Sequence, residues 1–236
     1  MSILAVFFMT ATLQLNAQIN TGNIIKNLTG SGGSSLTNDE IIKGLKEALT
    51  IGSKNSSDKA SQLDGFYKNP QIKIPFPKEA QQMEQTLNNM GMTQQTRDFV
   101  KALNRAAEDA ARKAAPIFAD AIMKMTITDG VNIVKGSDDA ATQYLKQNTS
   151  SPLKDAFKPV VKSSLQKVEI TKYWNPLAKS YNKLPMLKKI NPDLDEYVTL
   201  KAMEGLFTLL AQEELKIRKD PMARTTDLLK KVFGGK

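Results

Sequence analysis

The sequence predicts an all-α protein built as a single multi-helix domain, and three observations support this fold class. From residue 37 onward, apolar residues recur at intervals of three and four, as they do along one face of an α-helix. Several of these segments follow a polar residue and a proline, which together favour the start of a helix. A sheet of any size needs at least two segments of alternating polarity, and the 236-residue chain offers a single short one.

The first 36 residues predict an export signal followed by a linker. Residues 3–13, ILAVFFMTATL, form an apolar run of the length found in secretory signals, and Leu15 and Ala17 stand three and one residues before a possible cleavage site. We therefore expect residues 1–17 to be a signal peptide, although no Lys or Arg precedes the apolar run; a buried N-terminal helix is the alternative. The Gly- and Ser-rich sequence that follows is typical of a flexible linker, which we assign to residues 18–36.

Residues 37–236 are predicted to form the helical domain. Thr37 and Glu40 have the spacing of a capping box, in which each residue bonds the backbone N–H of the other, so the first helix should begin there. The segment 64–77 then breaks the helical pattern, because it contains three prolines and an alternation of apolar residues. We expect a loop or short strand lying across the body of the domain, with these apolar residues directed inward: Ile72, Ile74 and Phe76.

Later helices are predicted from their starts and from their apolar faces. One helix should span about residues 77–89 and end at Gly91, with Thr93 capping the next. The segment 202–211, AMEGLFTLLA, is apolar nearly all round and is predicted to be a central helix around which the others pack. Further helix starts are expected at Ser137 or Asp138, Ser151, Thr171, Pro192 or Asp193, and Asp220.

The stretch 104–122, NRAAEDAARKAAPIFADAI, carries alanine pairs that recur every fourth residue. Small side chains allow a neighbouring helix to approach closely, so the alanine stripe predicts a packing seam. Pro116 cannot donate a hydrogen bond to the carbonyl of Arg112, so the helix should kink or restart there, either to wrap around a partner helix or to open a cavity. The charged residues predict i,i+4 ion pairs on the opposite face: Arg105–Asp109, Glu108–Arg112 and Asp109–Lys113.

Glu204 is the single charged residue in the predicted central helix. A buried carboxylate is costly unless it is paired, and arginine is the natural partner. We therefore predict a buried polar cluster, which is either a structural ion-pair network or a tuned acid and ligand anchor. Its candidate members are Arg105, Glu108, Arg112, Glu204, Arg218 and Arg224.

Asp138 and Asp139, with Asp129 upstream, form the best candidate for a cation site, because hard cations prefer carboxylate oxygens. The segment lacks the alternating spacing and the glycine of an EF-hand loop. The same aspartates equally well supply helix caps, where a negative charge is favourable. No metal ion and no cofactor is therefore assigned.

The composition excludes several kinds of site. The chain has no cysteine and no histidine, which rules out disulfides, thiolate metal sites and a Ser-His-Asp triad. Lys and Arg outnumber Asp and Glu by 33 to 24, so the chain should attract anions unless its lysines only keep helix faces solvated. Nucleic acid is not expected, since aromatics make up 6 % of residues and do not interleave with basic clusters. No later apolar run reaches about 18 residues, so no transmembrane segment is expected in the mature chain.

Six segments of the sequence, in order along the chain, carry a family resemblance. They are GLKEAL, LDGFYKNPQIKIPFP, LNRAAEDAARKAAPIFADAIMKMTITDG, GSDDAATQYL, EYVTLKAMEGLF and EELKIRKDPMARTTDLLKKVFG. Together they span about residues 41–234 and resemble the domain of unknown function 4197 family of bacterial exported proteins. The resemblance implies export and a single helical domain, and it implies no catalytic residue because the family has no established activity.

We therefore expect an exported, periplasmic or secreted, monomeric protein that acts by binding rather than catalysis. The expected partner is an apolar or amphipathic small molecule, or another envelope protein, held between helices near Pro116. The ten methionines suit an adaptable apolar site. One alternative is a carboxylate-dependent hydrolase, with or without a metal ion, that uses Glu204 or the pair Asp138 and Asp139. A second alternative is an anion-binding module for acidic polymers or lipid head groups.

Overall fold

The computed structural model of the protein describes residues 37–89, 91–167 and 193–233, together with residues 174, 179, 182, 183 and 189. Within these residues all regular elements are helices, as the sequence predicts. The predicted signal peptide and linker, and the predicted helix start at Thr171, lie outside the described part of the chain. The α-helices and the two 3₁₀ helices (η) are α2 (Asn38–Ser61), η1 (Lys78–Ala80), α3 (Gln81–Asn89), α4 (Thr93–Ala111), α5 (Ala114–Lys124), α6 (Ile127–Lys135), α7 (Ala140–Lys167), α9 (Leu194–Lys219), η2 (Pro221–Ala223) and α10 (Asp227–Phe233).

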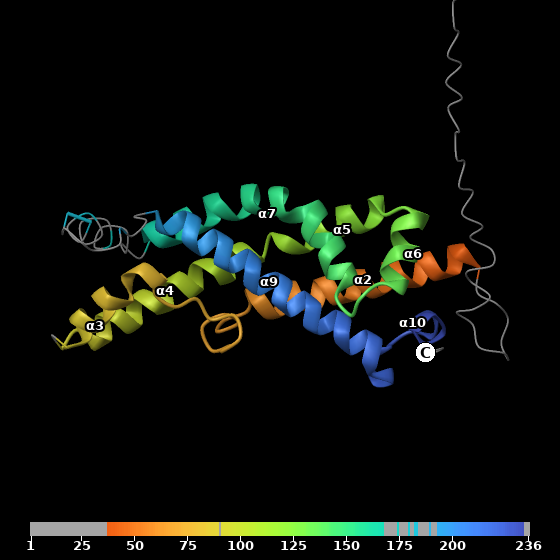
Figure 1. Cartoon of the computed structure of the whole chain (residues 1–236), viewed down its shortest axis with the longest axis horizontal. Helices are drawn as coiled ribbons and strands as arrows, with labels where there is room; N and C mark the ends of the chain where they lie inside the picture. The colour runs from red at the N-terminus through yellow and green to blue at the C-terminus, as the bar shows by residue number, and fades with distance from the viewer. Residues whose placement is uncertain are drawn as a thin grey trace, which may run out of the picture.

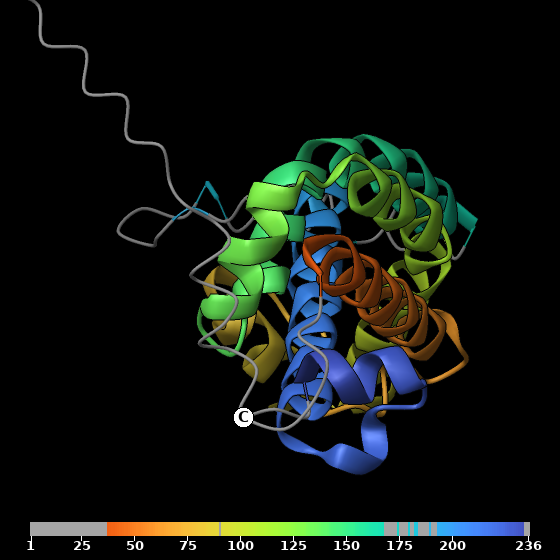
Figure 2. The same cartoon turned by 90° about the vertical axis from the view of Figure 1, so that its right-hand side faces the viewer.

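The helix α9 crosses the middle of the domain and packs against α2, α4 and α7 (Figures 1 and 2). Its middle contains the predicted central segment 202–211, in which most apolar side chains are buried. At one end of the long axis lie α3 and the start of α4, and at the other end lie α6 and α10 (Figure 1). The prediction of a single helical domain around this helix is therefore confirmed.

The first helix begins where its capping box predicts. The Thr37 side chain accepts from the backbone N–H of Glu40, and the Glu40 carboxylate accepts from the N–H of Thr37. The helix α2 then continues without interruption to Ser61. Its serines do not break it, because buried Ser56 and Ser57 donate their hydroxyl protons to carbonyls four residues earlier.

The proline-rich segment after α2 is irregular, as predicted, and lies beside α9 (orange in Figure 1). Ile72, Ile74 and Phe76 are buried, whereas Lys73 and Pro75 between them are exposed. This alternation is that of an extended chain with one face on a core. The segment therefore covers the core with one set of side chains and presents the other set to solvent.

The alanine stripe forms the predicted seam, and the helix restarts before Pro116. Ala106, Ala107, Ala110, Ala111 and Ala114 have no exposed surface. The helix α4 ends at Ala111 and α5 begins at Ala114, so the break falls at the carbonyl that Pro116 cannot bond. Pro116 itself occupies the first turn of α5, where its missing N–H has no partner to lose.

One predicted helix start is wrong, one is displaced and one has a different cap residue. The helix α4 begins at Thr93, as predicted, but Thr93 is its first residue, and Met92 in the cap position makes no side-chain cap bond. Ser151 lies inside α7, which continues through Pro152 and Pro159. Packing outweighs the prolines, because one face of α7 is fully buried over its whole length: Leu145, Leu153, Phe157, Val161 and Leu165. The start predicted at Ser137 or Asp138 lies two residues further on, at Ala140.

The last two predicted helix starts are confirmed. The Asp193 side chain accepts from the backbone N–H of Glu196 and caps α9. Asp220 accepts from the N–H of Met222, and Pro221 occupies the first position of η2. Both aspartates thus satisfy donors that a helix start leaves without a partner.

Candidate functional site

A surface cleft of about 450 Å³ lies between the outer side of the proline-rich segment and one face of α9. On α9 the lining residues recur at intervals of three and four, so they form one stripe of the helix. On the proline-rich segment, most lining residues belong to the set of alternating side chains that faces solvent. The lining consists of Gln71, Ile72, Lys73, Pro75, Lys78, Glu79, Tyr197, Lys201, Glu204, Gly205 and Thr208.

Tyr197 joins the two walls of the cleft. Its hydroxyl donates to the carbonyl of Pro75 at 3.0 Å. Burial raises the pKa of Tyr197 to about 12, and the charges of Glu79 and Glu204 add to the shift. The hydroxyl therefore stays protonated at neutral pH and keeps the proline-rich segment attached to α9.

The cleft carries three ammonium groups and two carboxylates. Lys201 is paired with Glu204 at 2.6 Å, so these two charges compensate one another. The Lys73 ammonium lies 4.6 Å from the centre of the Tyr67 ring, a cation–π contact that leaves its N–H groups able to donate. In the described part of the chain, neither Lys73 nor Lys78 forms an ion pair.

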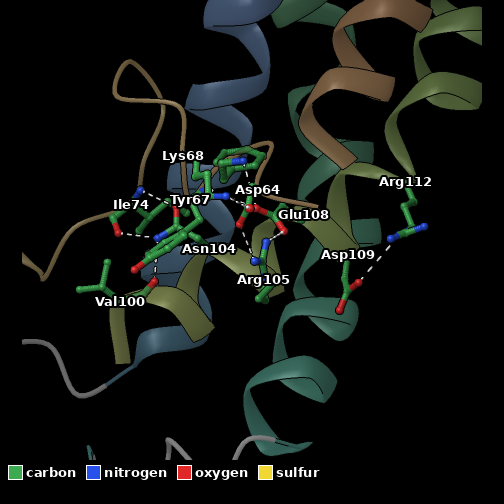
Figure 3. A network of polar contacts seen from close by, with 11 residues as sticks. Asp64, Tyr67, Lys68, Ile74, Val100, Asn104, Arg105, Glu108, Asp109 and Arg112 are labelled. Atoms are coloured by element: carbon green, nitrogen blue, oxygen red, sulfur yellow. Dashed lines mark hydrogen bonds and ion pairs between the residues drawn. The ribbon is translucent and has the colours of Figure 1, made fainter. Parts of the chain in front are cut away.

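The wall made by the proline-rich segment is held by a set of polar side chains on α4, which we call the α4 clamp: Asn104, Arg105 and Glu108 (Figure 3). The Asn104 amide accepts from the backbone N–H of Ile74 and donates to its carbonyl, each at 2.8 Å. Asn104 also donates to the carbonyl of Val100 at 2.7 Å, and it is fully buried. Its amide thus replaces the hydrogen bonds that a neighbouring strand would give to the extended segment.

Glu108 and Arg105 hold the beginning of the same segment. The Glu108 carboxylate accepts from the backbone N–H groups of Phe66 and Tyr67 at 3.1 and 3.2 Å. Arg105 bridges Glu108 and Asp64, with 2.5 Å to an oxygen of each. Hydrogen bonds from Lys68 and Arg105 hold the pKa of Asp64 below its ordinary value. These hydrogen bonds and ion pairs fix the start of the proline-rich segment within the protein itself.

Two backbone positions allow the segment to lie this close. Asp64 has a φ of 67°, in the left-handed region that few side chains adopt, and its ion pairs hold it there. On α9, a Cβ atom at Gly205 would lie 2.6 Å from the Phe66 ring and 3.0 Å from the Cβ of Ile72. A glycine at position 205 is therefore required for the packing of the segment against the helix.

The comparisons with known proteins identify a family and assign no activity. The profile of a family described as "Protein of unknown function (DUF4197)" matches residues 35–234. The chain belongs to this family. Searches among curated proteins and among solved structures gave no match. For this DUF4197 protein, the candidate site is therefore identified from the geometry of the structure alone. Among the described helices, none is both long and apolar enough to cross a bilayer.

The six residues of the predicted buried cluster do not come together in the DUF4197 protein. Arg105 and Glu108 belong to the α4 clamp, where their additional partner is Asp64. Glu204 was predicted to be buried, and this is wrong: its side chain is 66 % exposed and lines the cleft. Glu204 belongs to a polar stripe of α9 with Tyr197 and Lys201, and both of these residues precede the apolar window 202–211. The window alone therefore did not show that this side of the helix faces solvent.

Arg112 is also exposed, and the predicted i,i+4 pairs do not form. Its nearest acidic partner is Asp109 at 3.8 Å, on the side of α4 away from the clamp (Figure 3). Asp109 instead accepts a hydrogen bond from Ser164 of α7 at 2.9 Å. Because α4 ends at Ala111, Arg112 and Lys113 lie beyond the helix and lose the i,i+4 geometry.

Arg218 and Arg224 lie near the other end of α9, in a second polar group. Glu214 accepts from the backbone N–H groups of Ala141 and Thr142 at 2.9 and 2.8 Å, and from Arg218 at 2.8 Å. It therefore caps the start of α7 from a different helix. Arg224 donates to the carbonyls of Ile217 and Arg218 and satisfies the end of α9. The adjoining cavity of about 20 Å³ has room for about one water molecule.

The three predicted aspartates each bond to different partners. Asp129 forms a capping box with Thr126 at the start of α6. Asp138 pairs with Lys219 at 2.9 Å. Hydrogen bonds from Ser137 and Gln143 hold the pKa of Asp139 below its ordinary value. The described residues contain no group of three or more acidic side chains placed to hold a metal ion.

The sequence did not predict the residues that build the cleft. Tyr197 lines it, and Asn104 and Asp64 take part in holding its wall, but their bonding partners lie 30 to 122 positions away in the sequence. One signal was available: Tyr197, Lys201, Glu204 and Thr208 follow helical spacing. That stripe of polar residues on an otherwise apolar helix predicts one solvent-facing side.

Proposed function

We propose that this DUF4197 protein is exported and binds a small amphipathic molecule, without catalysis, in the cleft between the proline-rich segment and α9. The observation that carries the proposal is the cleft itself. Its volume of about 450 Å³ falls within the roughly 300–1,000 Å³ of small-molecule sites. Its lining combines apolar surface from Pro75 and Tyr197 with the charged groups of lysines and glutamates. Export is supported by the apolar run of residues 3–13.

The cleft replaces the region around Pro116 as the candidate binding site. Ala114 and Phe118, on either side of Pro116, have no exposed surface, and the Phe118 ring contacts the Phe207 ring of α9. Neither of the two cavities described above is lined by a residue of α5. The alanine seam therefore serves close helix packing, and the ligand is better placed at the cleft.

The groups in the cleft favour binding over proton transfer. An acid or base that works near neutral pH needs a pKa close to 7, and the Tyr197 hydroxyl has a pKa of about 12. Glu204, on which the hydrolase hypothesis depended, is exposed and paired with Lys201. These side chains are suited to hold polar parts of a ligand and to position its apolar part.

The proposal is tested by filling the cleft. Thr208→Trp places a large side chain in the cleft, and Thr50→Trp is a matched control on an exposed face of α2. Both threonines donate to the carbonyl four residues earlier, so the two changes remove the same kind of bond. Native mass spectrometry of the exported chain should find a copurified molecule of low mass. We expect Thr208→Trp to lose it and Thr50→Trp to keep it.

Two results would overturn the proposal. A ligand-free wild-type chain after mild purification from the envelope of its host would remove the basis for a small ligand. A ligand that survives Thr208→Trp would place binding elsewhere. If the protein cleaves the bound molecule and does not retain it intact, the hydrolase hypothesis is restored.

A further inference from the structure

We infer that the ligand of the cleft is a single-chain amphiphile with an oxyanion head group, which Lys73 and Lys78 bind. This inference rests on the proposed function and adds the chemical class of the ligand. It depends on three features of the cleft: the unpaired lysine charges in its lining, the fixed backbone that carries them, and the apolar surface of the same lining.

The first feature is the imbalance of unpaired charge. Lys68 and Lys201 each have a carboxylate partner, Asp64 at 2.8 Å and Glu204 at 2.6 Å. Lys73 and Lys78 have none among the residues that the structure describes. The remaining carboxylate of the lining is Glu79, whose charge contributes to the raised pKa of the Tyr197 hydroxyl. Two ammonium groups against one carboxylate favour an anion over a cation.

The second feature is that both lysines stand on rigid backbone. The residue after Lys73 is Ile74, whose N–H and carbonyl are both bonded by buried Asn104. Lys78 follows Pro77 and begins η1, so its backbone is fixed as well. Because the backbone at both positions is set before binding, no backbone entropy is lost there when an anion is bound, and only the lysine side chains are ordered.

The third feature is the apolar surface of the cleft lining. Pro75 and the Tyr197 ring line the same cleft as the two lysines. A head group at Lys73 and Lys78 leaves the attached chain along this surface, where burial of its CH₂ groups favours binding. A polar anion without a chain would use the lysines alone, and a neutral lipid would use the apolar surface alone.

The test compares ligands that share a twelve-carbon chain and differ in the head group. Dodecanoate and dodecyl phosphate carry oxyanions, monolaurin is neutral, and dodecyltrimethylammonium is cationic. Isothermal titration calorimetry below the micelle concentration should give the two anions about tenfold lower Kd than monolaurin. The better of the two anions identifies the head group as carboxylate or phosphate.

The variants assign this preference to the two lysines. Lys73→Gln with Lys78→Gln should raise the Kd of the anions about tenfold and leave that of monolaurin unchanged. Lys43→Gln with Lys101→Gln, at exposed lysines of α2 and α4, is the matched control and should change neither. Thermal unfolding of both double variants is measured in parallel, and equal midpoints confirm that both fold.

The outcomes separate the inference from the proposed function. If anionic and neutral ligands bind equally and Thr208→Trp abolishes both, the inference is overturned and the cleft still binds amphiphiles. If no amphiphile binds, or Thr208→Trp changes nothing, the proposed function fails with it. If the chain binds heparin through Lys73 and Lys78 but binds no amphiphile, the site takes acidic polymers and the inference is overturned.

Discussion

Asn104 bonds both backbone groups of Ile74, accepting from its N–H and donating to its carbonyl at 2.8 Å each (Figure 3). The two residues are 30 positions apart, and both are buried. Because a buried backbone group without a partner costs about 1–3 kcal/mol, an irregular segment can cover a core only if side chains supply such bonds. The part of the cleft wall around Ile74 thus depends on one amide of α4.

Asn104→Ala should lower the free energy of unfolding by about 3 kcal/mol, since it leaves the N–H and carbonyl of Ile74 unsatisfied. Asn148→Ala is the control, because Asn148 is exposed and donates to a single carbonyl of its own helix. We expect the control to change stability by less than about 0.5 kcal/mol. Urea unfolding followed by circular dichroism measures both, and equal losses would show that Asn104 has no special role.

A second prediction concerns the close approach of the proline-rich segment to α9. Gly205→Ala should destabilise the protein by about 1–3 kcal/mol, because the new Cβ would lie 2.6 Å from the Phe66 ring and 3.0 Å from the Cβ of Ile72. It should also weaken ligand binding, since moving the segment moves the wall of the cleft.

Gly52→Ala is the matched control for this change. At that position of α2, the nearest side-chain atoms would be 3.8 Å from the new Cβ, which is ordinary contact. The higher helix propensity of alanine should then raise stability by up to about 1 kcal/mol. Opposite signs for the two variants in urea unfolding are expected; two losses of equal size would mean that helix geometry, and not the segment, decides the outcome.

The fold was largely predictable because its signals are local. The capping box of Thr37 and Glu40, the cap at Asp193 and the alanine seam each depend on residues close together in the sequence. The inward alternation of residues 72–76 was equally local. The continuity of α7 through Pro152 was not, since it follows from burial against α4 and α9.

The candidate site was much less predictable, because its parts meet only in the folded chain. The α4 clamp joins residues about 40 positions apart, and Tyr197 bonds a carbonyl 122 positions away. No local pattern indicates such partners. The arginines were expected to neutralise Glu204, but they bond carboxylates and carbonyls that lie nearer to them in space.

A third prediction concerns acid stability at the contact between α2 and α9. Burial alone would raise the pKa of Glu213, but hydrogen bonds from Lys59 and Lys216 outweigh it and hold the pKa below the ordinary value of 4.5. A carboxyl group whose pKa is lowered by folding stabilises the fold above its unfolded pKa, and this stabilisation is lost as the pH falls through the folded value.

Glu213→Gln should therefore cost about 1 kcal/mol at pH 7, and less as the pH falls below 4.5. The measurement is urea unfolding of wild type and variant at several pH values from 7 to the acid limit of folding. We expect the two stability curves to converge on the acid side. Curves that stay parallel would assign the pH dependence to other carboxylates.

The last prediction compares two glutamates of α9: Glu214, which lies beyond the apolar window 202–211, and Glu204, which lies within it. Glu214 is almost fully buried, pairs with Arg218 at 2.8 Å and caps α7. Glu214→Ala should cost about 3 kcal/mol or more, because it leaves the Arg218 guanidinium buried without its carboxylate. Glu204→Ala removes only an exposed pair and should change stability by less than about 0.5 kcal/mol. Urea unfolding distinguishes them, and a large loss in Glu204→Ala would mean that the cleft is closed in solution and Glu204 is buried there.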